Sequence, residues 1–280
     1  MGATRRRLYR VVLVILTAAI SVYALAPLVW ALTSGFRSEG DIFRYMSPFT
    51  WKTFIPAPFT LDNVVTVVNS SFPLALWNSI LTTALTVALG LLISVPAAFA
   101  LAAMKFKGAG LVFAVILISF LIPFESIAIP LTQTFRSLDL QNTIIGIVLP
   151  GIGNGLAIFQ LRQFFAGIPV ELSEAARLDG VTWFGIMWRI YVPLAKPAII
   201  GAVLLLFVFQ WQAYLWPLLI APDPQYVLAP VAIANYASEH SVDYGAIFLA
   251  GVITAVVPLV VLLFSQKYFT HSIATSGSKG

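Results

Sequence analysis

The sequence contains no cysteine and little charge. The absence of cysteine excludes disulfide scaffolds, cysteine-ligated zinc or iron–sulfur sites and thiol catalysis, and it leaves the redox compartment open. Charged residues make up 10% of the 280 residues, against about 25% in an ordinary soluble domain. Apolar residues make up 60%, and the mean hydropathy is +0.94. A water-soluble globule could not bury so much apolar surface, so we expect the chain to lie in a bilayer.

Nucleotide-binding and metal-binding signatures are also missing. The sequence has no G-x-x-x-x-G-K-[ST] phosphate-binding loop and no H-E-x-x-H zinc motif. The net charge of +5 does not indicate nucleic acid as a partner, because basic residues of membrane proteins gather on the cytoplasmic side. We therefore expect a non-catalytic chain without a metal site or a cofactor of its own.

Long stretches with few or no charges predict an all-α integral membrane protein. A bilayer core about 30 Å thick requires roughly 20 apolar residues of helix. Six stretches approach or exceed this length and predict six transmembrane helices: Val11–Thr33, Leu74–Met104, Gly110–Leu131, Thr143–Phe164, Ala198–Ala221 and Gly245–Ser265. Pro123, Glu125 and Pro130 interrupt the third. Since neighbouring helices can satisfy the backbone groups that a proline frees, we expect a kinked helix there rather than a loop.

The lysines and arginines predict the orientation. With both termini in the cytoplasm, twelve of the 16 basic residues lie inside, and only Arg37, Arg44, Lys52 and Arg136 lie outside. The basic N-terminus and the apolar run after it also imitate a cleavable signal peptide. The run continues through Leu32, however, which favours a retained first helix.

The sequence shows no internal repeat and no linker, so we expect one transmembrane domain over residues 1–280. Three parts of it lie outside the bilayer in this interpretation. They are an external segment at residues 36–72, a cytoplasmic loop at 166–196 and a cytoplasmic tail at 266–280.

The cytoplasmic loop has the pattern of a short exposed helix. Pro169 and Glu171 mark a helix start, since proline is tolerated in the first turn and an acid is favourable near the positive end of the helix dipole. Gly180 marks the end. Glu174 and Arg177, three residues apart, are placed to pair across one turn.

The small side chains of Ala175 and Ala176 would let another backbone approach this helix closely. The apolar stretch that follows, residues 183–190, is expected at the membrane interface, where it would fix the loop helix to the fifth span. The loop therefore has features of a docking element.

The spacing of the loop residues carries a resemblance. The run E-A-A-R-L-D-G, from Glu174 to Gly180, is followed after nine residues by Ile190-Tyr191-Val192-Pro193. This pattern resembles the EAA loop of permease subunits of bacterial ABC importers, E-A-A-x3-G-x9-I-x-L-P, with Val192 where leucine is usual. The flanking residues and the tail are similar to the carbohydrate-uptake branch, and most of all to its maltose-type second permease. The likeness covers essentially the whole chain.

The resemblance implies a type I ABC importer permease fold in the bacterial plasma membrane. The chain would belong to an ATP-driven importer of a sugar or sugar-like solute, and its loop would couple ATPase closure to alternating access. The implied partners are a homologous sister permease, an ABC ATPase dimer that binds ATP and Mg, and an extracytoplasmic substrate-binding protein. The coupling residues would be Glu171, Glu174, Ala175, Ala176, Arg177, Asp179, Gly180 and Pro193.

Polar groups inside predicted spans are candidates for a substrate pathway, because they are unfavourable in a bilayer. The candidates are Asn78, Glu125, Asn154, Gln210, Trp211, Gln212 and Tyr214. The last four precede Pro217, which we expect to break the helix. Amides and aromatic rings suit a sugar, but the same residues fit an interfacial aromatic belt and interhelical hydrogen bonds equally well.

Two other functions stay open from the residues alone. A glycerol-phosphate or polyol derivative is an alternative solute within the same class. A self-sufficient secondary transporter is an alternative from another class, although such proteins often have related halves and this sequence shows none.

Overall fold

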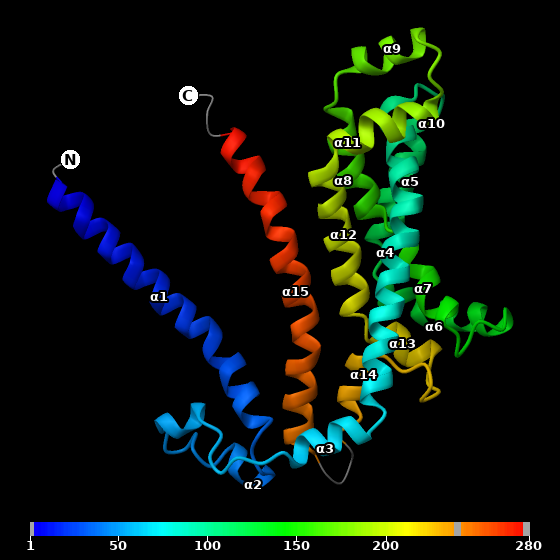
Figure 1. The fold of residues 1–280 in the computed structure, drawn as a ribbon. Helices are drawn as coiled ribbons and strands as arrows, with labels where there is room; N and C mark the ends of the chain where they lie inside the picture. The colour runs from blue at the N-terminus through cyan, green and yellow to red at the C-terminus, as the bar shows by residue number, and fades with distance from the viewer. Residues whose placement is uncertain (1–2, 238–241, 277–280) are drawn as a thin grey trace. The chain divides into compact units, whose positions relative to one another are not determined.

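The computed structural model describes residues 3–237 and 242–276, so the end of the predicted tail, residues 277–280, lies outside the described residues. Within these ranges the chain forms helices and turns and no β-strand, which confirms the all-α class (Figure 1). The elements in chain order are α1 (Ala3–Ser34), α2 (Glu39–Ile42), the 3-10 turn η1 (Trp51–Phe54), α3 (Asp62–Asn69), α4 (Phe72–Ala103), α5 (Ala109–Leu121), α6 (Phe124–Ser137), α7 (Ile144–Ile152), α8 (Gly155–Ala166), α9 (Val170–Leu178), α10 (Trp183–Ile186), the π-helical turn η2 (Met187–Tyr191), α11 (Val192–Leu194), α12 (Lys196–Trp211), α13 (Leu215–Ile220), α14 (Ala229–Ala234) and α15 (Tyr244–Ser276).

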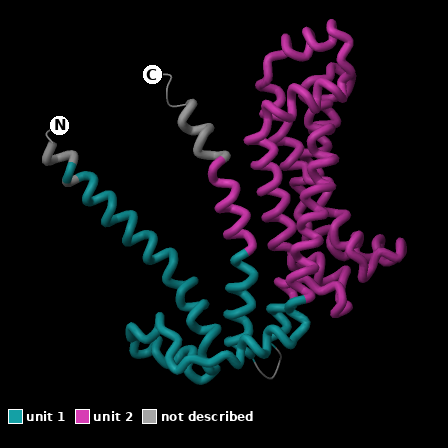
Figure 2. Tube along the Cα trace, viewed as in Figure 1, with its two compact units in different colours: residues 1–73, 232–256 teal, residues 74–231, 257–280 magenta. Residues whose placement is uncertain are grey.

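The chain divides into two compact units (Figure 2). Unit 1 comprises residues 1–73 and 232–256, and unit 2 comprises residues 74–231 and 257–280. Helix α15 contributes to both. All residues predicted for the coupling loop and for the substrate pathway belong to unit 2.

In unit 1, the segment that follows α1 is built around a buried arginine. Arg37 is 0% exposed, and its guanidinium donates hydrogen bonds to the backbone carbonyls of Lys52, Thr53 and Ile55. Burial lowers the pKa of Arg37, because the charged form loses hydration. From the sequence, Arg37 was predicted only to lie on the external side. In the structure its side chain stabilises the turn η1.

Among the described residues, three helices are long and apolar enough to cross a membrane, over Tyr9–Ser34, Phe72–Ala103 and Tyr244–Lys267. Three further pairs of shorter helices are bent at a break, by 95° between α5 and α6, 41° between α7 and α8, and 86° between α11 and α12. The number of crossings reaches six if each bent pair counts as one.

The third predicted span does not continue through its prolines. Helix α5 ends at Leu121, and α6 leaves it at 95°. Ile122 has an extended backbone, as expected before Pro123, whose ring disfavours a helical conformation in the preceding residue. The expectation of a continuous kinked helix over Gly110–Leu131 was therefore wrong, because the helix is broken at Ile122 and Pro123, and Glu125 lies in the first turn of α6.

The fifth predicted span is also interrupted, but not where we expected. Helix α12 ends at Trp211, and Pro217 lies inside the short helix α13. A proline removes the hydrogen bond to the carbonyl four residues earlier and clashes with it, which here is the carbonyl of Ala213. The break therefore precedes Pro217 by about one turn and leaves residues 212–214 between the two helices.

The core of unit 2 joins helices from distant parts of the sequence. Phe99 of α4 makes edge-to-face contacts with Phe165 of α8, with Trp183 of α10 and with Tyr191 of η2, at centroid distances of 6.5, 6.2 and 4.9 Å. Such aromatic pairs add about 0.5–1.5 kcal/mol each beyond the burial of apolar area. This aromatic cluster packs α4, α8, α10 and η2 together, and α9 is attached to that packed group through α10.

Candidate functional site

Helix α9 begins and ends where the sequence predicts. Pro169 directly precedes its first residue, and Glu171 lies in its first turn. After Asp179, Gly180 has a φ of +78°, a left-handed conformation that favours glycine. The N–H of Val181 donates to the carbonyl of Ala176 at 2.9 Å, so the last turn closes as a Schellman motif.

The two faces of α9 have different surroundings. Ser173 and Ala176 are buried, and Ala176 joins the apolar core of unit 2. Glu171, Glu174 and Ala175 are exposed. The expectation that both alanines face a partner was therefore wrong for Ala176, because the 3.6-residue period of the helix turns it inward.

Leu178 extends the exposed face by one turn. Residues 171, 174, 175 and 178 follow the spacing of one helix face, and the side chain of Leu178 is 89% exposed. An apolar side chain so open to solvent does not contribute to the core of this chain. Leu178 was not among the residues predicted to bind a partner, although its position four residues after Glu174 could have indicated it.

Arg177 does not pair with Glu174. Its guanidinium carbon lies 5.1 Å from the ring centre of Trp183, a cation–π distance. This contact connects the end of α9 to the start of α10, and it leaves the carboxylate of Glu174 available on the exposed face.

The segment after α9 leads into the bundle through a sharp bend. Thr182 caps α10 by accepting a hydrogen bond from the N–H of Gly185 at 3.2 Å. Pro193 is exposed in the short α11, which the 86° bend separates from α12. The residues from α10 to α11 therefore run nearly perpendicular to α12.

Two predicted pathway residues form hydrogen bonds that hold the fold. The side-chain amide of Asn78 donates to the carbonyls of Gln225 and Val227, at 2.8 and 3.2 Å. Asn154 accepts from the N–H of Ala157 at 3.0 Å and caps α8 at the 41° bend. These bonds engage Nδ2 of Asn78 and Oδ1 of Asn154 within the chain, so both side chains contribute to the fold.

Gln210 and Trp211 lie inside unit 2. Gln210 is buried and its Nε2 atom has no hydrogen-bond partner among the described residues. A Cβ added to Gly151 would lie 3.0 Å from Cγ2 of Thr86 and 3.1 Å from Oε1 of Gln210, so α4, α7 and α12 meet closely there. The hydroxyl of Thr86 is likewise buried without a partner, and the sequence analysis had missed this residue.

The remaining pathway candidates have other surroundings. Trp211 stacks on Phe207 at a centroid distance of 5.6 Å. Gln212 and Tyr214 are exposed beyond the end of α12, and Glu125 is exposed on α6. The structure thus brings together Gln210 and Thr86 but does not gather the seven candidates into one site. No group of three or more metal-ligating side chains occurs in the described part of the chain.

Comparisons with known proteins give a consistent result. A family described as "Binding-protein-dependent transport system inner membrane component" matches residues 90–275. The chain is 34% identical over 266 residues to the arabinooligosaccharides transport system permease protein AraQ of Halalkalibacterium halodurans, covering 94% of each chain. It is 30% identical over 262 residues to the sn-glycerol-3-phosphate transport system permease protein UgpE of Yersinia pestis, covering 90% of this chain and 91% of that protein.

One solved structure supports the fold. The crystal structure of a bacterial ABC transporter involved in the import of the acidic polysaccharide alginate contains a chain that matches with a TM-score of 0.78 at 22% identity. The match covers 96% of this chain and 99% of that chain. At this identity the likeness shows the architecture alone.

Proposed function

This chain belongs to the family of binding-protein-dependent transport system inner membrane components, and we propose that it carries a sugar or sugar-like solute across the bacterial plasma membrane. It is a non-catalytic, multi-pass permease subunit of an ABC importer, and ATP hydrolysis takes place in a separate subunit. Family membership favours this class over a self-sufficient secondary transporter.

The exposed face of α9 is the observation that supports a coupling role. Glu171, Glu174, Ala175 and Leu178 form a continuous surface that no other part of unit 2 covers, while Ser173 and Ala176 anchor the opposite side. We propose that this face docks on the ATPase, which binds ATP and Mg. The aromatic cluster around Phe99 connects α9 to α4 and α8, so that movement of the ATPase would move these helices together.

The other partners follow from the proposed orientation. With both termini in the cytoplasm, α9 is cytoplasmic and the segment at residues 36–72 faces outward, towards a substrate-binding protein. A homologous sister permease would complete the pathway. Twelve of the 16 basic residues on the cytoplasmic side support this orientation.

The solute is proposed as a sugar because a relative named for arabinooligosaccharide transport is 34% identical along 94% of this chain. Glycerol phosphate is the second candidate, since a relative named for its transport is 30% identical. Among the six segments predicted to cross the bilayer, only Thr143–Phe164 contains a Lys or Arg. That residue, Arg162, donates a hydrogen bond to the carbonyl of Leu101, so the predicted spans offer little positive charge to an anionic solute.

The decisive experiment is reconstitution of the transporter in lipid vesicles with its ATPase, sister permease and binding protein. We expect ATP hydrolysis to require the complete assembly and to rise when the binding protein carries an oligosaccharide. Glycerol phosphate serves as the competing solute. Solute flux through this chain alone, without ATP, would contradict the proposal.

A further inference from the structure

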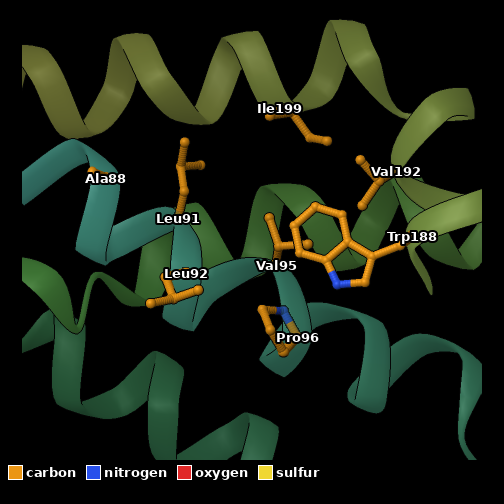
Figure 3. Close-up of a pocket in the computed structure, with 8 residues that line it drawn as sticks. All are labelled: Ala88, Leu91, Leu92, Val95, Pro96, Trp188, Val192 and Ile199. Atoms are coloured by element: carbon orange, nitrogen blue, oxygen red, sulfur yellow. The ribbon is translucent and has the colours of Figure 1, made fainter. Parts of the chain in front are cut away.

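An apolar groove runs along one side of unit 2 (Figure 3). Its volume is about 250 Å³, and all eight lining residues are apolar, including Leu91, Leu92, Val95 and Pro96 of α4. Trp188 of η2 and Ile199 of α12 line the opposite side. The lining carries no charge, and its one side-chain hydrogen-bonding group is the indole N–H of Trp188. Such a groove does not suit a sugar, so it calls for a different occupant.

The segment above the groove has the pattern of an interfacial helix. From α10 to α11, Ile186, Met187 and Tyr191 are buried, while Phe184 and Trp188 are exposed. The 86° bend makes this segment run along the membrane surface when α12 crosses the bilayer. Tryptophan is favoured at that depth, because its ring is amphipathic. The indole of Trp188, 44% exposed, lies beside Val95 and Pro96 at the mouth of the groove (Figure 3).

Basic residues lie close in sequence to the elements that form this end of the groove. Arg189 directly follows Trp188, and Lys196 precedes Ile199 by three residues; both are exposed. Lys105 and Lys107, also exposed, lie in the link after α4. The C-terminal part of α4 is near α10, since Phe99 contacts Trp183. Residues 72–124 and 183–211 contain no Asp or Glu, so these cations are not neutralised within their own segments.

We propose that the groove binds one acyl chain of an anionic phospholipid whose phosphate is held by Arg189 and Lys196. Along α4 the groove extends from Ala88 to Pro96, about 12 Å at the rise of an α-helix, which fits within one bilayer leaflet of about 15 Å. Ala88 also lines a second apolar cavity, of about 430 Å³, between α4, α12 and α15. The apolar surface therefore continues towards the bilayer centre, as an acyl chain requires.

The partner is a phospholipid rather than a protein because apolar lining and flanking cations occur together. Basic residues at a membrane surface attract anionic headgroups, and each improves binding by about fivefold. The inference does not depend on which solute is transported, so it can hold or fail independently of the proposed function.

The test uses the assembled transporter in lipid nanodiscs. One set contains phosphatidylglycerol with brominated acyl chains and the other phosphatidylcholine with the same chains, each as a minor component. Bromine quenches tryptophan fluorescence on contact, and the difference between wild type and Trp188→Phe isolates Trp188. We expect at least fivefold stronger quenching of Trp188 by the anionic lipid at equal mole fraction. The double variant Arg189→Gln, Lys196→Gln should remove the preference, and Arg136→Gln on α6 should keep it.

A second variant tests the groove itself. Leu92 is 63% exposed, so Leu92→Trp can fill the groove without disturbing the core. Native mass spectrometry should show loss of co-purified phosphatidylglycerol from Leu92→Trp but not from Leu111→Trp, a matched exposed position on α5. Equal quenching by both lipids, or equal lipid retention in both variants, would overturn the proposal. So would quenching confined to the isolated chain, because the sister permease would then cover the groove.

Discussion

Leu178 presents its side chain to solvent at the end of α9, on the same face as Glu174 and Ala175. Burial of a leucine in a partner stabilises a complex by about 1.5–3 kcal/mol. Because Leu178 makes little contact within its own chain, its replacement separates docking from folding.

We expect Leu178→Ser to reduce co-purification of the ATPase and ATP-driven uptake by about tenfold or more. Affinity of the ATPase for the permease, measured in detergent, gives the direct readout. Leu138→Ser, at a similarly exposed leucine after α6, is the control and should behave as wild type. Full ATPase binding by Leu178→Ser would exclude the exposed face of α9 as the docking surface.

Substitutions of Gly180 and Glu174 also test the coupling role of α9. The first changes a residue with a left-handed backbone, and the second reverses a charge on the exposed face. At a φ of +78° a residue with a Cβ costs up to about 1–2 kcal/mol, and Asp less than most, although open space surrounds the position of an added Cβ. We expect Gly180→Asp and Glu174→Lys to abolish uptake and to leave membrane insertion intact, as judged by the amount of protein in the membrane fraction. Wild-type uptake in both variants would eliminate the coupling role of α9.

At the scale of elements, the contact between α4, α7 and α12 depends on a helical glycine. A Cβ at Gly151 would lie 3.0 Å from Cγ2 of Thr86 and 3.1 Å from Oε1 of Gln210, so a larger side chain fits only if these neighbours shift. Small residues allow helices in a membrane to approach closely, and van der Waals packing then holds them together.

We expect Gly151→Val to force these helices apart and to destabilise the protein by about 1–3 kcal/mol. The readout is the apparent Tm of the purified protein in detergent. Gly110→Val on α5 is the matched control, because nothing lies within 4 Å of an added Cβ there. An unchanged Tm for Gly151→Val would show that the contact adapts to extra volume.

Hydropathy predicts the long single helices but not the breaks within the other predicted spans. Apolar runs of about 20 residues correctly located α4 and most of α15, which are single long helices. The same reasoning extended one helix across Pro123, a second across the break between α7 and α8, and a third across Ala213. Hydropathy reports burial in lipid but not whether backbone hydrogen bonds continue, so a broken helix and a straight one look alike.

At the scale of the whole molecule, the natural absence of cysteine makes the orientation easy to test. Lys52→Cys and Lys107→Cys place single thiols at exposed positions in the predicted external segment and in the link between α4 and α5. The cells are first treated so that a membrane-impermeant maleimide reaches the outer face of the plasma membrane. The maleimide should label the thiol of Lys52→Cys in intact cells, and that of Lys107→Cys only after the plasma membrane is permeabilised. The reverse pattern would place the termini and α9 outside.

The sequence by itself determined the membrane location, the helical class, the start and end of α9 and the family pattern. These properties depend on composition, on spacing along the chain and on residues such as Gly180 that act locally. Only the tertiary structure decided that Ala176 faces inward while Leu178 faces outward, that Arg37 holds the turn η1, and that Thr86 meets Gln210 at Gly151. The groove beside Trp188 likewise required α4, η2 and α12 to be placed together. Each of these features depends on contacts between residues far apart in sequence, and the periodicity of one segment carries no information about its neighbours.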